Sequence, residues 1–299
     1  MALRPIDNAL PLTPERPKKQ VKVSTPIQKQ AEFGVNDENM VPLLPDTDAA
    51  VIDYISSENL EPIPDPEIKI QGLVDGLDSK DWIKVCDSLN NARRFALHHS
   101  SLLLPILEKV VVVVVKAMKN PRSALCKTSI MASTDIFKVF GDKLLDFTTD
   151  VFDSMLLQLL LKSSQDKRFV CDEADLALIA MVKSISPLPL LQKLQLYVSH
   201  ANLRIRAKVA ICISNCASNM GLEGMKEFGL VLLLQTAAYS LKDRLPEARE
   251  AARKLVIAIF EAYTEREEQE LKQESWQSFC QSNLSAINAL SMAKITTSH

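Results

Sequence analysis

From residue 68 onward, apolar residues recur at intervals of three and four, and short polar stretches interrupt them. This spacing places apolar side chains on one face of a helix. Residues 1–66 lack the periodicity and contain ten of the fifteen prolines. Such a stretch cannot bury enough apolar surface to offset the entropy lost on ordering, so we predict a disordered tail over residues 1–66.

The helical part contains an internal repeat, in which a polar turn leads into a helix. Five such starts align on an apolar residue, with a second apolar or small residue four positions later on the same helical face. The aligned pairs are Val85 and Leu89, Leu125 and Ser129, Val170 and Ala174, Ile205 and Val209, and Ala248 and Ala252. The steps of 40, 45, 35 and 43 residues are typical of HEAT and armadillo arrays. Another apolar helix precedes each start, so we predict an all-α fold, an α-solenoid of about five to six HEAT-like helix pairs.

One local pattern conflicts with this prediction. Residues 110–115 are six consecutive valines, and β-branched residues favour strands. The run lies where the repeat requires the first helix of a pair, and helix propensities differ by only fractions of a kcal/mol per residue. We therefore predict a helix here.

Composition narrows the function classes. Hydrophobic residues make up 47% of the 299 residues, aromatic residues 5%, and there are seven glycines, which suits stacked helices better than a β-sandwich. The net charge of −2 argues against a surface built for nucleic acid. An apolar stretch at residues 102–118 is interrupted by Pro105, Glu108 and Lys109, so we predict a buried solenoid helix and no membrane partner. No signal peptide is expected at the N-terminus.

The residues that carry catalysis or bind metals form no recognisable pattern. The six cysteines include no Cys-x-x-Cys pair and are expected to be buried, reduced thiols. The four histidines do not lie at ligand spacing from a cysteine pair, and no Gly-rich phosphate loop or nucleophile elbow occurs. We predict no metal, no cofactor and no enzymatic activity.

The first predicted turn, Ser79-Lys80-Asp81-Trp82, resembles the start of a TOG domain of the CLASP N-terminal family. The resemblance covers residues 67–260 and rests on turn chemistry together with the repeat register. It implies a flat paddle of about six HEAT pairs, an armadillo-type fold, that binds αβ-tubulin through one edge of turns. The residues implied at this edge are Lys80, Asp81, Trp82, Lys119, Asn120, Arg122, Lys127, Lys167, Arg168, Asn202, Arg204, Lys208, Arg244 and Arg249.

Elementary physics supports such an edge. All turns within the pairs of a solenoid emerge on one side, so residues about 40 apart in sequence form a row. The row is basic at four of its five turns, which suits the acidic surface of tubulin. Trp82 either anchors the interface or packs against its own repeat. Arg206 and Arg249 stand where HEAT helices often hold an arginine that braces a neighbouring repeat, so a structural role is an equal alternative for both.

The predicted tail is divided in charge. Residues 1–30 carry six Lys and Arg against two acids, and residues 31–66 carry nine acids and no Lys or Arg. The basic half either contacts an acidic surface or is a solvated linker. Thr13 and Thr25, each followed by proline, are candidate phosphorylation sites, and a phosphate there would cancel positive charge.

Residues 261–299 follow the repeat and combine a charged stretch with one plausible amphipathic helix. Two readings stay open for this segment. It caps the open end of the stack, which is the favoured reading because solenoid ends need covering, or it mediates dimerisation. The oligomeric state is left open.

Three functional hypotheses follow. The first is a microtubule-associated protein that binds tubulin or microtubules and modulates their dynamics, in the cytoplasm and on the cytoskeleton, with other cytoskeletal proteins as further candidate partners. The alternative is a generic ARM/HEAT adaptor that binds a peptide or helix along its second helices. Nucleic-acid binding through the basic edge is the least favoured, because the net charge is close to zero.

Overall fold

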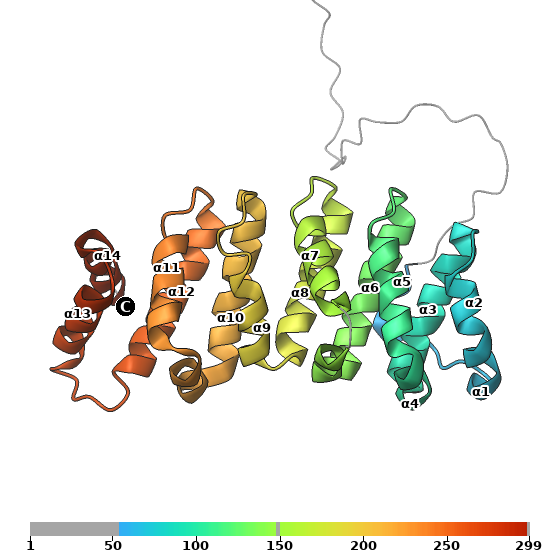
Figure 1. Ribbon diagram of the computed structural model, residues 1–299, viewed down its shortest axis with the longest axis horizontal. Coiled ribbons are helices and arrows are strands. Elements are labelled where there is room, and N and C mark those ends of the chain that lie inside the picture. The colour runs from blue at the N-terminus through green and yellow to red at the C-terminus, as the bar shows by residue number, and fades with distance from the viewer. Residues whose placement is uncertain (1–53, 148–149, 298–299) are drawn as a thin grey trace, which may run out of the picture. The chain divides into compact units, whose positions relative to one another are not determined.

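A computed structural model describes residues 54–147 and 150–297 of the chain, all within one compact unit. The predicted disorder of residues 1–53 and the candidate phosphorylation sites Thr13 and Thr25 lie outside the described residues. Helices are the only regular secondary structure in the described part, and they stand in pairs that follow one another in chain order (Figure 1). The predicted all-α solenoid is therefore confirmed.

Six helix pairs make up the described stack, one more than the five clear turns of the sequence. They are α2 (Leu73–Leu77) with α3 (Trp82–His98), α5 (Leu107–Met118) with α6 (Ser123–Phe140), α7 (Val151–Lys162) with α8 (Arg168–Ser184), α9 (Pro187–Gln195) with α10 (Leu203–Phe228), α11 (Leu230–Ser240) with α12 (Pro246–Tyr263), and α13 (Lys272–Asn283) with α14 (Ala286–Thr297). Short helices join or precede them: η1 (Ser57–Asn59), α1 (Pro66–Lys69), η2 (Ile70–Gly72), α4 (Ser100–Leu103), η3 (Leu104–Ile106) and η4 (Gly141–Asp146).

Polar side chains cap the second helices of two pairs, α3 and α10. Asp81 accepts a hydrogen bond from the N–H of Ile83 at 3.0 Å, and Asn202 accepts one from the N–H of Arg204 at 2.9 Å. These caps satisfy N–H groups that have no partner inside the helix. These two second helices therefore start where the repeat register places them.

The residues that the repeat register aligns lie in the core of the stack. All ten aligned residues, from Val85 and Leu89 to Ala248 and Ala252, are buried. In α5, Val110, Val111, Val114 and Val115 are buried, whereas Val112 is 48% exposed. This one-sided burial is the spacing of a helix, so the helical prediction for the valine run is confirmed. Burial of four β-branched side chains outweighs their weak preference for strands.

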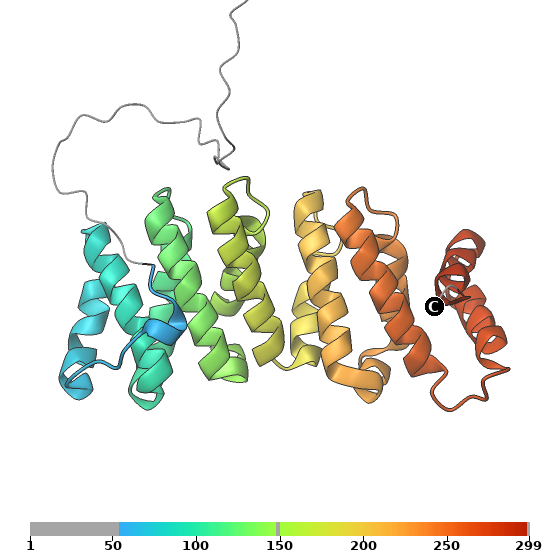
Figure 2. The ribbon, with the colours of Figure 1, turned by 180° about the vertical axis from the view of Figure 1, so that it is seen from behind.

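The predicted tail boundary at residue 66 is wrong for its last residues. Residues 54–66, here called the strap, cross the helices of the first two pairs (Figure 2). Leu60 and Ile63 are buried, and the Leu60 carbonyl lies 2.7 Å from Nε2 of His98 at the end of α3. The strap lacks periodicity because it packs as an extended segment with one short turn of helix. Two apolar anchors and hydrogen bonds hold it, rather than a helical face.

The last described segment forms two helices where one was expected. Trp276 of α13 is fully buried against Phe260 and Tyr263 of α12, with ring centroids 5.5 and 6.2 Å away. The break at Leu284 and Ser285 lets α14 fold back beside α13. Whether this sixth pair serves as a cap or in dimerisation stays a prediction. Within residues 54–147 and 150–297, no helix combines the length and apolar character needed to span a membrane.

Candidate functional site

The turns within the helix pairs line up along one edge, the upper edge in Figure 1, here called the turn edge. Each turn precedes the start of a second helix, at Trp82, Ser123, Arg168, Leu203 and Pro246. Stacking thus brings together residues that are about 40 positions apart in sequence. The residues predicted for a binding edge lie on or next to these turns, but their partners divide them into two groups.

Trp82 and Arg122 join the first two turns. The Arg122 guanidinium carbon lies 5.4 Å from the centroid of the Trp82 ring, a cation–π contact between neighbouring pairs. Trp82 is half-buried and packs against the core, whereas Arg122 is exposed. Its packing agrees with the structural reading of Trp82, and the reading in which Trp82 anchors an interface stays a prediction. The Asn120 side chain accepts a hydrogen bond from the Arg122 N–H at 2.9 Å and shapes this turn.

The lysines beside this contact have no acidic partner. Lys80 and Lys119 are exposed, and their side chains make no ion pair or hydrogen bond with any described residue. Lys116, in the last turn of α5, is exposed and equally free of partners in the described part. Sequence reasoning missed Lys116 because it followed the turns alone. Its position three residues before Lys119 was the available signal, since residues three apart share a helix face.

Cations of the third turn have modest contacts. Lys167 donates a hydrogen bond from Nζ to Oγ of Ser123 at 3.1 Å, which links the third turn to the second. Arg168 pairs with Asp172 one helical turn later at 3.7 Å, and both side chains are mostly exposed. Such an exposed pair within a helix contributes little, so Arg168 can exchange this partner at small cost.

Further along, cations bind acids of the neighbouring pair. Arg204 lies 2.5 Å from Asp166, and Lys208 lies 2.6 Å from Asp175. Lys127 lies 3.8 Å from Glu173, and its ammonium also lies 4.5 Å from the Tyr54 ring of the strap. Three of the predicted edge cations are thus already neutralised by carboxylates of the stack.

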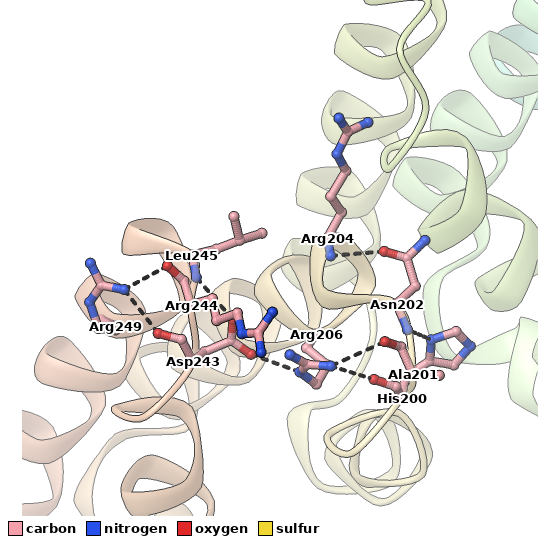
Figure 3. A network of polar contacts seen from close by, with 9 residues as sticks. All are labelled: His200, Ala201, Asn202, Arg204, Arg206, Asp243, Arg244, Leu245 and Arg249. Carbon is pink, nitrogen blue, oxygen red and sulfur yellow. Dashed lines mark hydrogen bonds and ion pairs between the residues drawn. The ribbon is translucent and has the colours of Figure 1, made fainter. Parts of the chain in front are cut away.

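Arg206 and Arg249 repeat one arrangement in successive pairs (Figure 3). Nη1 of Arg206 donates to the carbonyls of His200 and Ala201 in its own turn, at 2.9 and 3.3 Å. Nη1 of Arg249 donates in the same way to the carbonyls five and six residues before it, at 2.8 and 2.9 Å. Each arginine therefore holds the turn in front of its own helix, which is a structural use of the side chain.

Asp243 connects these two turns. Its Oδ2 lies 2.7 Å from Nε of Arg206, and its Oδ1 accepts the N–H of Leu245 at 3.0 Å. Burial alone would raise the pKa of the Asp243 carboxyl, but the Leu245 N–H and the Arg206 guanidinium outweigh burial and lower it. The carboxylate is charged at neutral pH and fixes the fifth turn against the fourth. Arg244, next to it, is exposed, and its side chain makes no hydrogen bond or ion pair with a described residue.

Comparison with known proteins identifies the family to which this chain belongs. The family model described as CLASP N terminal matches residues 96–282, more than half of the chain. This chain belongs to the CLASP N-terminal family. It is a TOG domain of the HEAT-repeat type, as the first turn and the register predicted.

A curated relative and two solved structures show how far this similarity of the TOG domain extends. The TOG array regulator of axonemal microtubules protein 1 of Mus musculus is 28% identical over 215 residues, which are 69% of this chain and 12% of that protein. The chain thus spans a small part of that relative's length. The TOG domain of Zyg9 from C. elegans has a TM-score of 0.57 at 16% identity, covering 82% of this chain and 91% of that one. A structure described as "Crescerin uses a TOG domain array to regulate microtubules in the primary cilium" has a TM-score of 0.51 at 12% identity, covering 80% and 90%.

Two features of the described part of this TOG domain bear on metal binding and on thiol chemistry. Among the described residues, no group of three or more His, Cys, Asp or Glu side chains is placed so that it could hold a metal ion. Burial raises the pKa of the Cys86 thiol to about 11 and those of Cys212 and Cys280 to about 12. These thiols are therefore protonated and poor nucleophiles at neutral pH.

Proposed function

We propose that this TOG domain binds αβ-tubulin through the turn edge, chiefly at its first two helix pairs, and that it modulates microtubule dynamics. The observation that carries the proposal is the contact between Arg122 and Trp82, set among lysines that have no acidic partner in the described part. A partly exposed Trp beside an Arg is the kind of residue pair that dominates protein interfaces. Tubulin offers the acidic surface that such a cluster complements.

Relatives support the choice of partner. The mouse relative is named as a regulator of axonemal microtubules, and the Crescerin structure is described as one that regulates microtubules. By this analogy the chain acts on the cytoskeleton in the cytoplasm, and other cytoskeletal proteins are further candidate partners. The matched part of the mouse protein is a small fraction of its length, so the proposal concerns this TOG domain alone.

The cations that already form ion pairs are expected to contribute less to tubulin binding than the unpaired ones. Arg204 and Lys208 already share their charge with Asp166 and Asp175, so a carboxylate of a partner would gain less from either than from an unpaired cation. Arg249 likewise is held by the carbonyls of its own turn. We infer that these residues stiffen the edge and that Lys80, Trp82, Lys119 and Arg122 make its principal contacts. Lys127, Lys167, Arg168, Asn202 and Arg244 remain further candidates at the edge.

The strap makes the adaptor alternative less favourable over the first two pairs. An adaptor of the armadillo type would hold a peptide along the second helices. Ser57 and Leu60 of the strap already bond to α6 and α3, through Asp135 and His98. A peptide from another protein would have to displace this segment of the same chain.

Tubulin binding is tested by gel filtration and sedimentation of the chain with purified tubulin at low and moderate salt. The variants are Trp82→Ala and Arg122→Ala, with Lys183→Ala as the matched control. Lys183 is exposed and lies at the far end of α8, away from the turn edge. We expect the parent to form a complex, the control to match it, and each edge variant to bind about tenfold or more weakly.

Two results would count against the proposal. If the parent forms no complex even at low salt, tubulin is not the partner. If the parent binds and both edge variants bind as tightly as Lys183→Ala, then tubulin is bound elsewhere on the domain. Circular dichroism of each variant checks that the helices are retained, because Trp82 also packs against the core.

A further inference from the structure

A small pocket opens beside Trp82, between α2, α3 and α5. Its volume is about 120 Å³, and its lining includes the apolar side chains of Leu77 and Val113 beside the Trp82 ring. Lys80 and Lys116 line the same pocket. Ser79 and Asn120 add polar groups. The pocket thus combines apolar walls with two ammonium groups and two neutral polar side chains.

Lys116 also lines a second pocket, on the other side of α5. This larger pocket, of about 370 Å³, lies between α5 and α7 and is lined by Lys116 and Lys119 together with Val112 and Val151. Asp150 also lines it, but neither lysine forms an ion pair with Asp150 or with any other described residue. Lys116 therefore stands between two hollows of the surface, with its charge uncompensated in the described part.

The lysines of this region differ from three other cations of the turn edge in their ion pairs. Along the turn edge, Lys127, Arg204 and Lys208 each have a carboxylate of the neighbouring pair within 4.0 Å. Lys80, Lys116 and Lys119, gathered around the first two turns, have none among the described residues. Positive charges placed close together repel one another, so this arrangement is stabilised when an anionic group joins it.

We propose that the pocket beside Trp82 receives a glutamate side chain of the bound partner, with Lys116 and Lys80 as the groups that bind its carboxylate. This inference rests on the proposed function and extends it from the turns onto α5. A glutamate suits the pocket because its two methylene groups match the apolar walls of Trp82 and Val113, while its carboxylate reaches the ammonium groups. A volume of 120 Å³ holds several water molecules and hence a side chain of a few heavy atoms.

The role of Lys116 differs from that of Arg122. Arg122 lies over the ring of Trp82, so its charge is shared with the π face. Lys116 approaches the same ring region from α5 and has no such partner. It is therefore a specificity residue for an acidic side chain, whereas the Trp82 and Arg122 pair supplies the broader contact area.

The test compares Lys116→Ala with Lys109→Ala in binding of the whole chain to purified tubulin. Lys109 is exposed and lies seven residues earlier on the same face of α5, about 10 Å from Lys116 along the helix. Both substitutions remove one exposed positive charge from the same helix. We expect Lys116→Ala to raise the dissociation constant about tenfold, because a hydrogen bond between two charged groups is lost, and Lys109→Ala to leave it unchanged.

A second readout locates the carboxylate directly. A carbodiimide joins a lysine amine to a carboxylate only where the two are in contact, and mass spectrometry identifies the joined residues. We expect links from Lys116 to glutamates of tubulin in the parent complex and no links from Lys109.

The outcomes separate the two proposals. If the complex forms and Trp82→Ala weakens it, but Lys116→Ala binds like the parent and Lys116 forms no link, the glutamate pocket is refuted and the turn edge stands. If links form from Lys109 as often as from Lys116, the proposed glutamate binding in the pocket is refuted as well, because contact with tubulin is then not confined to the pocket. If the parent forms no complex with tubulin, the proposed function fails, and the glutamate pocket fails with it.

Discussion

Arg93 of α3 and Asp135 of α6 form a buried ion pair between the first two helix pairs, with Nε 2.7 Å from Oδ2. Their side chains are 1% and 0% exposed. Nη1 of Arg93 also donates to Asn90 at 3.1 Å, and Ser57 of the strap donates to Oδ1 of Asp135 at 2.6 Å. The carboxylate therefore fixes the strap and the junction between α3 and α6 at once.

Removing one member of this ion pair should lower the stability of the fold considerably. We expect Asp135→Ala to lower the free energy of unfolding by about 3–5 kcal/mol, because it leaves the buried Arg93 charge without its ion-pair partner. The double variant Arg93→Leu with Asp135→Leu should lose much less, since neither charge then needs compensation. Urea denaturation, monitored by circular dichroism, measures the loss in the single and in the double variant. Equal losses for the single and double variants would show that packing, and not the unpaired charge, sets the cost.

Acid should weaken the junction between the fourth and fifth turns. The pKa of Asp243 is lowered in the folded state, since the Leu245 N–H and Arg206 outweigh the effect of burial. The carboxylate therefore contributes stability that is fully present above its unfolded pKa of about 3.9 and is lost as the pH falls through the lower folded value. We expect the free energy of unfolding of the parent to fall more steeply below about pH 4 than that of Asp243→Asn.

The control for this pH dependence is Asp172→Asn. Asp172 is 65% exposed and pairs only with Arg168 in its own helix. Its removal should leave the slope of stability against pH close to that of the parent. If Asp243→Asn shows the same slope as the parent, then Asp243 does not carry the acid sensitivity.

Much of the fold was predictable because apolar residues recur at matching positions in each repeat. Val85 and Ala248, which are 163 residues apart, were aligned by spacing alone, and both are buried. Capping residues such as Asp81 and Asn202 mark the helix starts, since they are side chains that bond the N–H two residues later. These signals are local, so one sequence is enough to read them.

The strap and the ion pairs were not predictable in the same way. The bond between Ser57 and Asp135 joins residues that are 78 positions apart, and nothing in the proline-rich context of Ser57 indicates an ordered partner. Arg204 resembled a free edge cation because its partner Asp166 belongs to the preceding pair. Such contacts depend on how the pairs stack, which local spacing does not specify.

The cysteines should differ in reactivity by position. Cys171 is only partly buried at the start of α8, whereas the other five cysteines are buried. Burial raises the pKa of Cys171 too, so its thiol is mostly protonated near neutral pH. With iodoacetamide at pH 8, we expect slow labelling of Cys171, about tenfold faster than of any other cysteine, and labelling of all six after unfolding in urea. Mass spectrometry of the peptides measures this, and rapid labelling of Cys212 in the native chain would contradict its burial.

Gly141 should not tolerate a side chain. Its φ of +49° lies in the left-handed region, and an added Cβ would lie 2.7 Å from the backbone oxygen of Ser184 at the end of α8. We expect Gly141→Ala to lower the free energy of unfolding by about 1–3 kcal/mol, because the backbone is strained and a backbone oxygen cannot move away cheaply. Gly72→Ala is the matched control, since nothing lies within 4 Å of its added Cβ and its φ is −85°. Chemical denaturation should show the control to be neutral or slightly stabilised, and equal losses in both variants would exclude strain at Gly141.

Trp276 should hold the sixth helix pair on the stack. Its ring is fully buried, with Phe260, Phe279 and Tyr263 around it, and Tyr263 stacks on Phe279 with centroids 4.1 Å apart. We expect Trp276→Ala to cost about 3–5 kcal/mol, because it leaves a large cavity between α12 and α13. Since α13 and α14 reach the stack through α12, the loss should be local. Hydrogen exchange should rise in α13 and α14 and stay unchanged in α3 and α6.

The conservative variant at the same site is Trp276→Phe. Nε1 of Trp276 has no hydrogen-bond partner among the described residues, so phenylalanine gives up volume but no hydrogen bond. Its cost should be clearly smaller than that of Trp276→Ala, and α13 should stay protected from exchange. If Trp276→Ala raised exchange equally along the whole chain, the six pairs would unfold as one unit. The last pair would then be an integral part of the stack, and its removal would unfold the turn edge as well.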